Sequence, residues 1–258
     1  MRQYLDVSKL QQRAQKRQEL SLIQKIEHFV HINNETNNAN DTEAKSLQDL
    51  VEEILDQSTI GACTAHAFDY AYRIQCTDKT FKPSRLYFYF HERLAEDPNH
   101  DVKDLTDSGA DVLDGLEYVM KYGVCSENLW PYDIAKFEDL PGPECDQDAQ
   151  QHKIKSYKQL KESDIKHYIL NNIPVLVAVQ LYDSFNDIDE TGIVPIPKKS
   201  EELLGGHELC VISFDNKRKL YGCVNSWGPT FGANGYVFFP YAYFQNKHLL
   251  IELAAFQV

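Results

Sequence analysis

Residues 57–68 read Gln57-Ser58-Thr59-Ile60-Gly61-Ala62-Cys63-Thr64-Ala65-His66-Ala67-Phe68 and lead into the most regular helical pattern of the chain. Beyond Cys63, apolar residues recur at the i, i+3, i+4 and i+7 positions of a helix that packs against a core, namely Ala67, Tyr70, Ala71 and Ile74. A helix that begins at Cys63 would surround the thiol with unpaired N–H groups and the positive end of the helix dipole, which favours a thiolate. Cys63 is therefore a candidate nucleophile. A lone cysteine at this position is also often a small apolar core residue.

The pattern changes from helical to extended along the chain. Val112, Leu116 and Val119 repeat the helical spacing ahead of Gly123, which is a plausible helix stop. After Pro143 the apolar residues fall into short β-branched and aromatic runs, PVLVAVQLY (174–182), LCVISF (209–214), LYGCVNSW (220–227) and GYVFFP (235–240). The sequence predicts an α+β protein, with a mainly helical part over 46–150 and a mainly β part over 151–258 that meet at a cleft.

The first 45 residues differ in character from the rest of the chain. Residues about 8–30 have apolar residues at roughly helical intervals among basic ones, which indicates an amphipathic helix. The segment 32–46, INNETNNANDTEAKS, is rich in Asn and lacks a periodic apolar pattern, as linkers do. We therefore expect an N-terminal extension over 1–45 and one domain over 46–258.

Two further motifs follow in the β part of the chain. Gly205-Gly206-His207 leads into one of the predicted strands, and Val224-Asn225-Ser226-Trp227-Gly228 follows another. Together with Gln57, six residues before Cys63, these motifs resemble the papain family of cysteine peptidases, with Cys, His and Asn in the order typical of that family. The resemblance extends from about residue 50 to the C-terminus and implies the papain-like, cathepsin-like fold, in which a helical lobe and an antiparallel β lobe flank the active-site cleft.

The resemblance also implies a role for each of these residues. His207 takes the proton of the Cys63 thiol and later gives it to the leaving amine, while Asn225 orients the imidazole ring. The Gln57 amide and the backbone N–H of Cys63 form the oxyanion hole. Trp227 shields the His-Asn bond and lies near substrate. No metal or organic cofactor is implied, and the scattered cysteines lack zinc-site spacing.

Four further residues are candidate substrate contacts. Gly109 and Ala110 resemble the family segment along which an extended substrate backbone lies; the alternative is that they only form a turn. Glu208 follows the histidine where the family usually has a small residue. With Asp111, it would line the pocket for the second residue upstream of the cut and favour Lys or Arg there. The alternative is a solvated carboxylate outside the pocket.

The charge distribution limits the range of partners. The net charge is −13, while residues 1–30 carry six Lys and Arg against three Asp and Glu. An acidic domain repels nucleic acids and anionic membranes, so neither is expected as a partner. The basic extension is expected to contact the acidic domain and to cover its cleft until it is cut or displaced; the alternative is a frayed extension. No secretory signal is seen, so we expect a cytoplasmic or otherwise intracellular protein with reduced thiols.

The predicted function is that of a cysteine-type peptidase, a hydrolase that cleaves polypeptide substrates through a thiolate-imidazolium pair and a thioester, as an endopeptidase. The alternatives on the same triad are an isopeptidase, an amidase or an aminopeptidase. A catalytically silent binding protein is the alternative from another class. His66, one helical turn beyond Cys63, is expected to be structural rather than a rival base.

Overall fold

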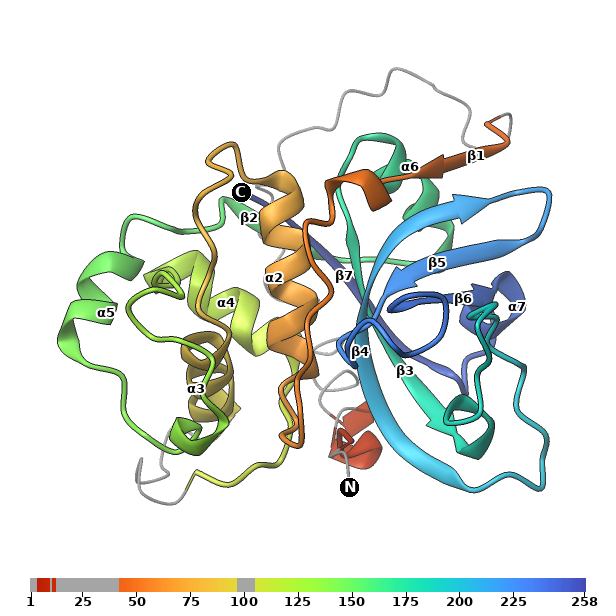
Figure 1. Ribbon diagram of the computed structural model, residues 1–258, viewed down its shortest axis with the longest axis horizontal. Helices are drawn as coiled ribbons and strands as arrows, with labels where there is room; N and C mark the ends of the chain where they lie inside the picture. Colours follow the sequence, from red (N-terminus) through yellow and green to blue (C-terminus); the bar gives the residue numbers. More distant parts are fainter. Residues whose placement is uncertain (1–3, 10, 13–41, 97–104) are drawn as a thin grey trace.

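The computed structural model describes residues 4–9, 11, 12, 42–96 and 105–258. They form a helical lobe and a sheet lobe that lie side by side (Figure 1). The predicted α+β class is confirmed. The helix expected over residues 8–30 and the linker up to residue 41 lie largely outside the described residues. Among the described helices, none combines the length and the apolar character that a membrane crossing requires.

The helical lobe is built from elements of the first half of the chain. Its helices are α2 (Cys63–Gln75), α3 (Arg85–Glu96), α4 (Val112–Tyr122) and α5 (Pro143–Ala149), with short 3-10 turns η1 (Gln48–Leu50) and η3 (Ile134–Lys136). α4 begins where the Asp111 carboxylate accepts a hydrogen bond from the N–H of Leu113, and it ends at Gly123, whose φ of 92° favours glycine. The helix predicted from the spacing of Val112 and Leu116 is therefore confirmed.

The sheet lobe is one antiparallel sheet. Within the described residues its strands follow the order β2-β7-β3-β4-β5-β6, and β1 pairs with β4. The strands are β1 (Ala44–Ser46), β2 (Ser156–Gln159), β3 (Val175–Tyr182), β4 (Leu203–Asp215), β5 (Leu220–Val224), β6 (Tyr236–Pro240) and β7 (Leu250–Gln257). The short elements η4 (Glu162–Asp164), α6 (Ile165–Leu170), η5 (Asp183–Phe185) and α7 (Tyr241–Phe244) connect them.

β1 changes the expected domain boundary. Ala44 and Ser46 pair with Asp215 and Ser213 of β4, and the amide of Asn216 donates to the carbonyl of Thr42. Residues assigned to the N-terminal extension therefore already belong to the sheet. The reason is that a short polar strand leaves no apolar pattern in the sequence, although its backbone groups still pair.

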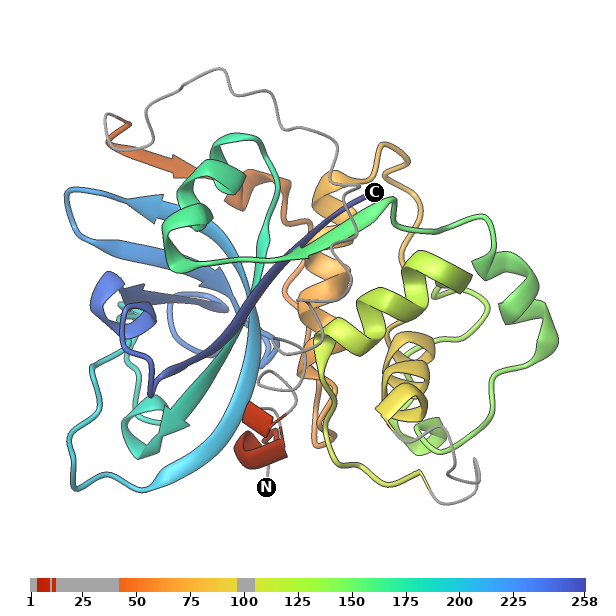
Figure 2. The same ribbon diagram turned by 180° about the vertical axis from the view of Figure 1, so that it is seen from behind.

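α2 is the central element of the molecule. It packs against α3 and α4 on one side and against β3 and β4 on the other (Figures 1 and 2), and its residues from Cys63 to Ile74 are all buried. The charged residues on this buried helix are paired, since Arg73 contacts Asp69 at 3.3 Å and Glu52 at 2.5 Å. The first residue of α2 thus lies where the two lobes meet.

Candidate active site

Cys63 is the first residue of α2 and is 1% exposed. Burial raises the pKa of its thiol, and the nearby Glu208 and Glu92 carboxylates act in the same direction, while backbone N–H groups of Glu208 and Thr64 lower it. The helix N-terminus favours a thiolate, as the sequence predicts, but the loss of water around the sulfur outweighs that effect in this structure. The surroundings of Cys63 therefore favour the thiol over the thiolate in this structure.

His207 and Asn225 form a hydrogen-bonded pair. His207 lies on β4, Asn225 follows β5, and His207 Nε2 is 2.8 Å from Asn225 Oδ1. The backbone N–H of Ser226 donates to the same Oδ1 at 2.9 Å, which identifies this atom as the amide oxygen. Because Oδ1 can only accept, His207 Nε2 carries a proton and donates it. Nδ1 is then the nitrogen that remains to exchange a proton with a reacting group.

Ser226 connects this pair to Gln57. Its hydroxyl donates to Gln57 Oε1 at 2.6 Å, and its carbonyl accepts from the backbone N–H of Gln57 at 2.8 Å. The amide nitrogen of Gln57 donates to the carbonyl of Ile60 at 3.0 Å. These bonds fix the orientation of the Gln57 amide, with its nitrogen on the side of the loop that leads to Cys63. Sequence reasoning missed this role, although Ser226 stands inside the motif that contains Asn225.

Aromatic rings cover the His-Asn pair. The ring of Trp227 lies 5.0 Å from that of His207 at an interplanar angle of 39°. The Trp227 ring also lies against the rings of Phe185 and Phe231, at centroid distances of 5.1 and 4.7 Å. Trp227 is 3% exposed. The rings exclude water from the hydrogen bond between His207 and Asn225, which strengthens it.

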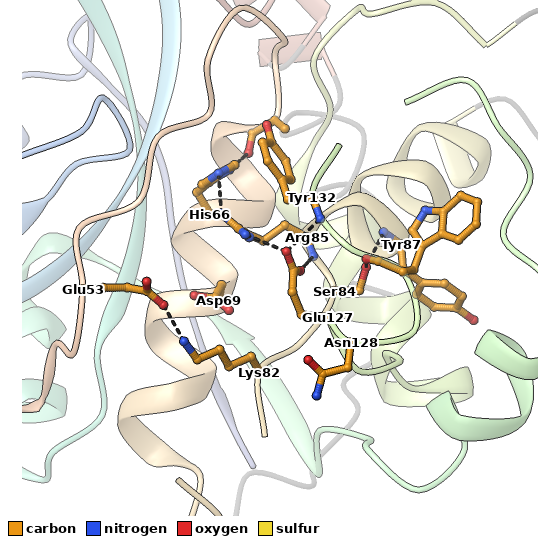
Figure 3. A network of polar contacts seen from close by, with 12 residues as sticks. Glu53, His66, Asp69, Lys82, Ser84, Arg85, Tyr87, Glu127, Asn128 and Tyr132 are labelled. Carbon is orange, nitrogen blue, oxygen red and sulfur yellow. Dashed lines mark hydrogen bonds and ion pairs between the residues drawn. The ribbon is translucent and has the colours of Figure 1, made fainter. Parts of the chain in front are cut away.

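A polar network supports the loop before α2 from the side of the helical lobe (Figure 3). The Tyr132 hydroxyl donates to the carbonyl of Gln57 at 2.9 Å, and His66 Nδ1 donates to the carbonyl of Ala62 at 2.7 Å. Arg85 lies 4.5 Å from the centre of the Tyr132 ring and 3.4 Å from His66 Nε2. Burial, and next the Arg85 charge, lower the pKa of His66 to about 3. His66 is thus a neutral, buried structural residue.

Glu127 holds Arg85 in this network. Its Oε1 is 2.6 Å from Arg85 Nη2 and accepts the backbone N–H of Tyr132 at 2.9 Å. The two ends of the loop, Gln57 and Ala62, are therefore each bonded to a side chain that Arg85 contacts. Sequence reasoning identified neither Tyr132 nor Arg85, because the network joins segments distant in sequence.

The described N-terminal residues 4–9, 11 and 12, here called the arm, lie between the lobes near the start of α2 (Figures 1 and 2). Leu5 pairs with Gly206 through two backbone hydrogen bonds of 2.8 and 2.9 Å. The Leu5 side chain is 3% exposed and packs against Cys63. Tyr4 meets Trp227 edge to face at 6.1 Å. The arm thus covers the residue beside the catalytic histidine candidate and the nucleophile candidate together.

Two glycines allow the arm to approach. A Cβ on Gly109 would lie 2.4 Å from a methyl carbon of Leu5, and a Cβ on Gly205 would lie 2.4 Å from the Cβ of Tyr4. Gly109 has a φ of +67°, so both its backbone conformation and the space around it favour glycine. Its N–H donates to the Tyr89 hydroxyl at 3.2 Å. Of the two residues predicted to contact a substrate backbone, Gly109 therefore provides space rather than a free N–H group.

The remaining predicted substrate residues are all buried. Ala110, Asp111 and Glu208 are 3%, 1% and 2% exposed. Glu208 is therefore not a solvated carboxylate. Asp111 has an additional structural role as the N-terminal cap of α4. No three described His, Cys, Asp or Glu side chains are arranged to hold a metal ion.

Comparison with known proteins agrees with this geometry. The family model for papain family cysteine proteases matches residues 36–252. An uncharacterised peptidase C1-like protein of Acanthamoeba polyphaga mimivirus is 36% identical over 211 residues, which cover 76% of this chain and 66% of that protein. Cysteine proteinase 3 of Dictyostelium discoideum is 32% identical over 135 residues, which cover 50% and 39%. The chain thus spans less than two thirds of the length of either relative.

Solved structures extend the comparison to the fold. Xylellain, a cysteine protease from Xylella fastidiosa, is 28% identical, and the match covers 84% of this chain and 86% of xylellain with a TM-score of 0.75. The family match covers both lobes and contains Cys63, His207 and Asn225. The chain belongs to the papain family of cysteine proteases.

Proposed function

We propose that the chain is a cysteine endopeptidase that is latent while its arm covers Cys63. The observation that carries the proposal is the fixed pair of His207 and Asn225, because it leaves Nδ1 of the ring as the atom to take the thiol proton. The resulting thiolate attacks the carbonyl carbon of a peptide bond and forms a thioester. The imidazolium returns the proton to the departing amine, and water then hydrolyses the thioester.

The oxyanion hole comes from Gln57 and Cys63. The Gln57 amide nitrogen and the backbone N–H of Cys63 would donate to the negative oxygen of the tetrahedral intermediate. Ser226, Tyr132 and the His66 network hold the loop that carries both donors. A preformed hole of this kind costs little reorganisation during the reaction, and this favours an active acyl-transfer site over a silent binding protein.

The course of the arm supports cleavage within a polypeptide. Tyr4 lies against Trp227 while Leu5 lies against Cys63, so an extended chain segment passes the nucleophile with residues on both sides of the contact. An aminopeptidase instead needs a group that receives a free chain end. A site that holds such a segment is suited to a substrate that is blocked at its N-terminus.

The arm also supports latency. Its two hydrogen bonds to Gly206 and the packing of Leu5 on Cys63 cover the site with this chain's own residues. Burial of the sulfur raises the pKa of the Cys63 thiol, which opposes formation of the attacking thiolate. Displacement of the arm would return water to the sulfur, so that the helix N-terminus and His207 can stabilise the thiolate.

The test is hydrolysis of an N-terminally blocked fluorogenic peptide under reducing conditions. The full chain is compared with Cys63→Ala, and with the chain lacking residues 1–41, which leaves Thr42 and β1 in place. We expect slow hydrolysis by the full chain, faster hydrolysis after the deletion, and none by Cys63→Ala. Hydrolysis of unblocked peptides alone would contradict the endopeptidase assignment, and equal rates with and without residues 1–41 would contradict latency.

A further inference from the structure

Asp107 connects the loop that leads to Cys63 with a separate segment of the helical lobe. Its Oδ1 atom accepts the backbone N–H of Gly61, two residues before Cys63, at 2.8 Å. The same oxygen accepts a hydrogen bond from the hydroxyl of Tyr89 on α3 at 2.5 Å. Asp107 itself belongs to the segment 105–111 that precedes α4. One carboxylate oxygen therefore joins three parts of the chain that are distant in sequence.

Tyr89 extends this connection to Gly109. Its hydroxyl donates to Asp107 and accepts the backbone N–H of Gly109 at 3.2 Å. The backbones of Gly61 and Gly109 also lie against each other, since a Cβ on Gly61 would be 3.1 Å from the nitrogen of Gly109 and 3.2 Å from its Cα. The hydrogen bonds that join Gly61 and Gly109 through Asp107 and Tyr89 are here called the clamp.

Arg93 fixes the Tyr89 ring. Tyr89 is 0% exposed, and the Arg93 guanidinium lies 4.1 Å from the centre of its ring. Arg93 also donates to the backbone carbonyls of Tyr89 and Thr106 at 3.1 and 3.2 Å. Thr106 directly precedes Asp107, so the same guanidinium holds both partners of the short bond. Burial and the nearby Asp107 charge raise the pKa of Tyr89 well above its usual value, and its hydroxyl therefore remains a donor at neutral pH.

The two sides of the clamp are surfaces that an extended chain touches in the cleft. Leu5 of the arm packs against Cys63, and one of its methyl groups lies where a Cβ of Gly109 would otherwise be. The loop 57–62 also carries the Gln57 amide of the proposed oxyanion hole. The position of Gly109 relative to this loop therefore sets where a bound backbone lies relative to the nucleophile. A misplacement of about 1 Å can lower a rate roughly 100-fold.

The loop before Cys63 has other supports, so it stays anchored when the clamp is removed. They are the bonds of Tyr132 and Ser226 to Gln57 and of His66 to Ala62. These bonds join the loop to residues outside the segment 105–111. The clamp differs from them because it links the loop to that segment and so fixes the distance between the two.

We propose that Asp107 and Tyr89 are positioning residues that align a bound polypeptide backbone with Cys63 and the oxyanion hole. The inference rests on the proposed peptidase function and concerns the same site. Both residues act through Gly61 and Gly109 rather than on the reacting atoms. Asp107 accepts two hydrogen bonds at one oxygen, a role that the amide oxygen of Asn can also fill. Asp107→Asn should therefore preserve the alignment, whereas Asp107→Ala should lose it.

The test compares, in the full chain, a reaction that needs backbone alignment with one that does not. The first is hydrolysis of an N-terminally blocked fluorogenic peptide. The second is alkylation of Cys63 by iodoacetamide, a small reagent without a peptide backbone, followed by peptide mapping. Both reactions require the arm to leave Cys63, so the ratio of kcat/KM to the alkylation rate constant cancels any change in arm docking. Unfolding of the site would instead change the alkylation rate as well.

We expect Asp107→Ala to lower this ratio about tenfold to a hundredfold, and Tyr89→Phe to lower it in the same direction. Asp107→Asn should restore most of the wild-type ratio. Asp78→Ala is the matched control, because Asp78 Oδ1 likewise accepts a backbone N–H and a hydroxyl, both from Thr80, at 2.9 and 2.7 Å. Asp78 is exposed and lies beyond the end of α2 that is opposite Cys63, so its replacement should leave the ratio unchanged.

The outcomes separate this inference from the proposed function. An unchanged ratio in Asp107→Ala overturns the positioning role while hydrolysis itself stands, and an Asp107→Asn chain as impaired as Asp107→Ala overturns the acceptor role of the oxygen. If the wild type hydrolyses no peptide, the peptidase function fails, and alkylation of Cys63 by a peptide-like inhibitor replaces hydrolysis in the ratio: a fall in Asp107→Ala supports the clamp, and no fall overturns it. Should Asp107→Ala fail to fold, Tyr89→Phe provides the same comparison, since it removes only the hydroxyl and keeps the ring against Arg93.

Discussion

The contact between Leu5 and Cys63 makes a quantitative prediction about latency. Leu5 is 3% exposed, so Leu5→Ala removes three nearly fully buried carbon atoms from the interface. At about 0.8 kcal/mol for each buried methylene group, the arm loses roughly 2 kcal/mol of docking free energy. That loss corresponds to about a 30-fold shift toward the displaced arm. The two backbone bonds to Gly206 remain, so the arm is weakened rather than removed.

The assay measures the initial rate of blocked-peptide hydrolysis and the rate of thiol alkylation at Cys63. We expect Leu5→Ala to raise both by up to about 30-fold, with the chain lacking residues 1–41 as the upper limit. Leu140→Ala is the matched control, because Leu140 is 64% exposed and distant from the arm in sequence. If Leu5→Ala leaves both rates at the wild-type level while removal of residues 1–41 raises them, the Leu5 contact does not hold the arm in place.

Two further predictions concern residues that support the site, and a third concerns His91, a buried histidine on α3 that stacks on Tyr118. Ser226→Ala removes the hydroxyl bond to Gln57 Oε1, one of the two bonds that orient the Gln57 amide, and should lower kcat about tenfold to a hundredfold with little change in KM. Steady-state kinetics measures this, and an undiminished kcat would contradict the positioning role of Ser226. Tyr132→Phe leaves the Gln57 carbonyl without a donor and should lower the free energy of unfolding by about 1–3 kcal/mol in urea titrations. Burial lowers the pKa of His91 to about 3 in the folded chain. Between pH 6.5 and 3, the His91 imidazole is therefore protonated in the unfolded chain and neutral in the folded chain. Relative to His91→Phe, the wild type should therefore lose about 1.4 kcal/mol of stability per pH unit between pH 6.5 and 3, and parallel pH profiles would contradict this.

The sequence predicts well those helices and strands in which buried apolar residues recur at a regular spacing. α2 and α4 follow from their i, i+3, i+4 stripes, and β3 follows from a continuous β-branched run. β7 reads LIELAAFQ, whose Leu, Glu, Ala and Gln residues favour helices. It is a strand because it pairs between β2 and β3, which is a tertiary effect that local propensity does not contain.

The residues of the site likewise fall into two groups, those that local motifs reveal and those that only the three-dimensional structure reveals. Cys63, His207 and Asn225 can be named from motifs, because each lies in a short segment of characteristic composition. The double role of Ser226 depends on which groups of distant segments face each other, so it requires the three-dimensional structure. The sequence also predicts a thiolate at the helix N-terminus, and it cannot anticipate that the arm removes water from the sulfur.

The central claim is that Cys63 is the nucleophile of a working acyl-transfer site. The most direct measurement is the intact mass of the full chain after treatment with a peptide-like, thiol-directed irreversible inhibitor, followed by mapping of the modified residue. We expect one adduct per chain, located on Cys63 and formed faster in Leu5→Ala. In Cys63→Ala, both the adduct and hydrolysis should be absent. An adduct on another cysteine, or hydrolysis that persists in Cys63→Ala, would contradict it.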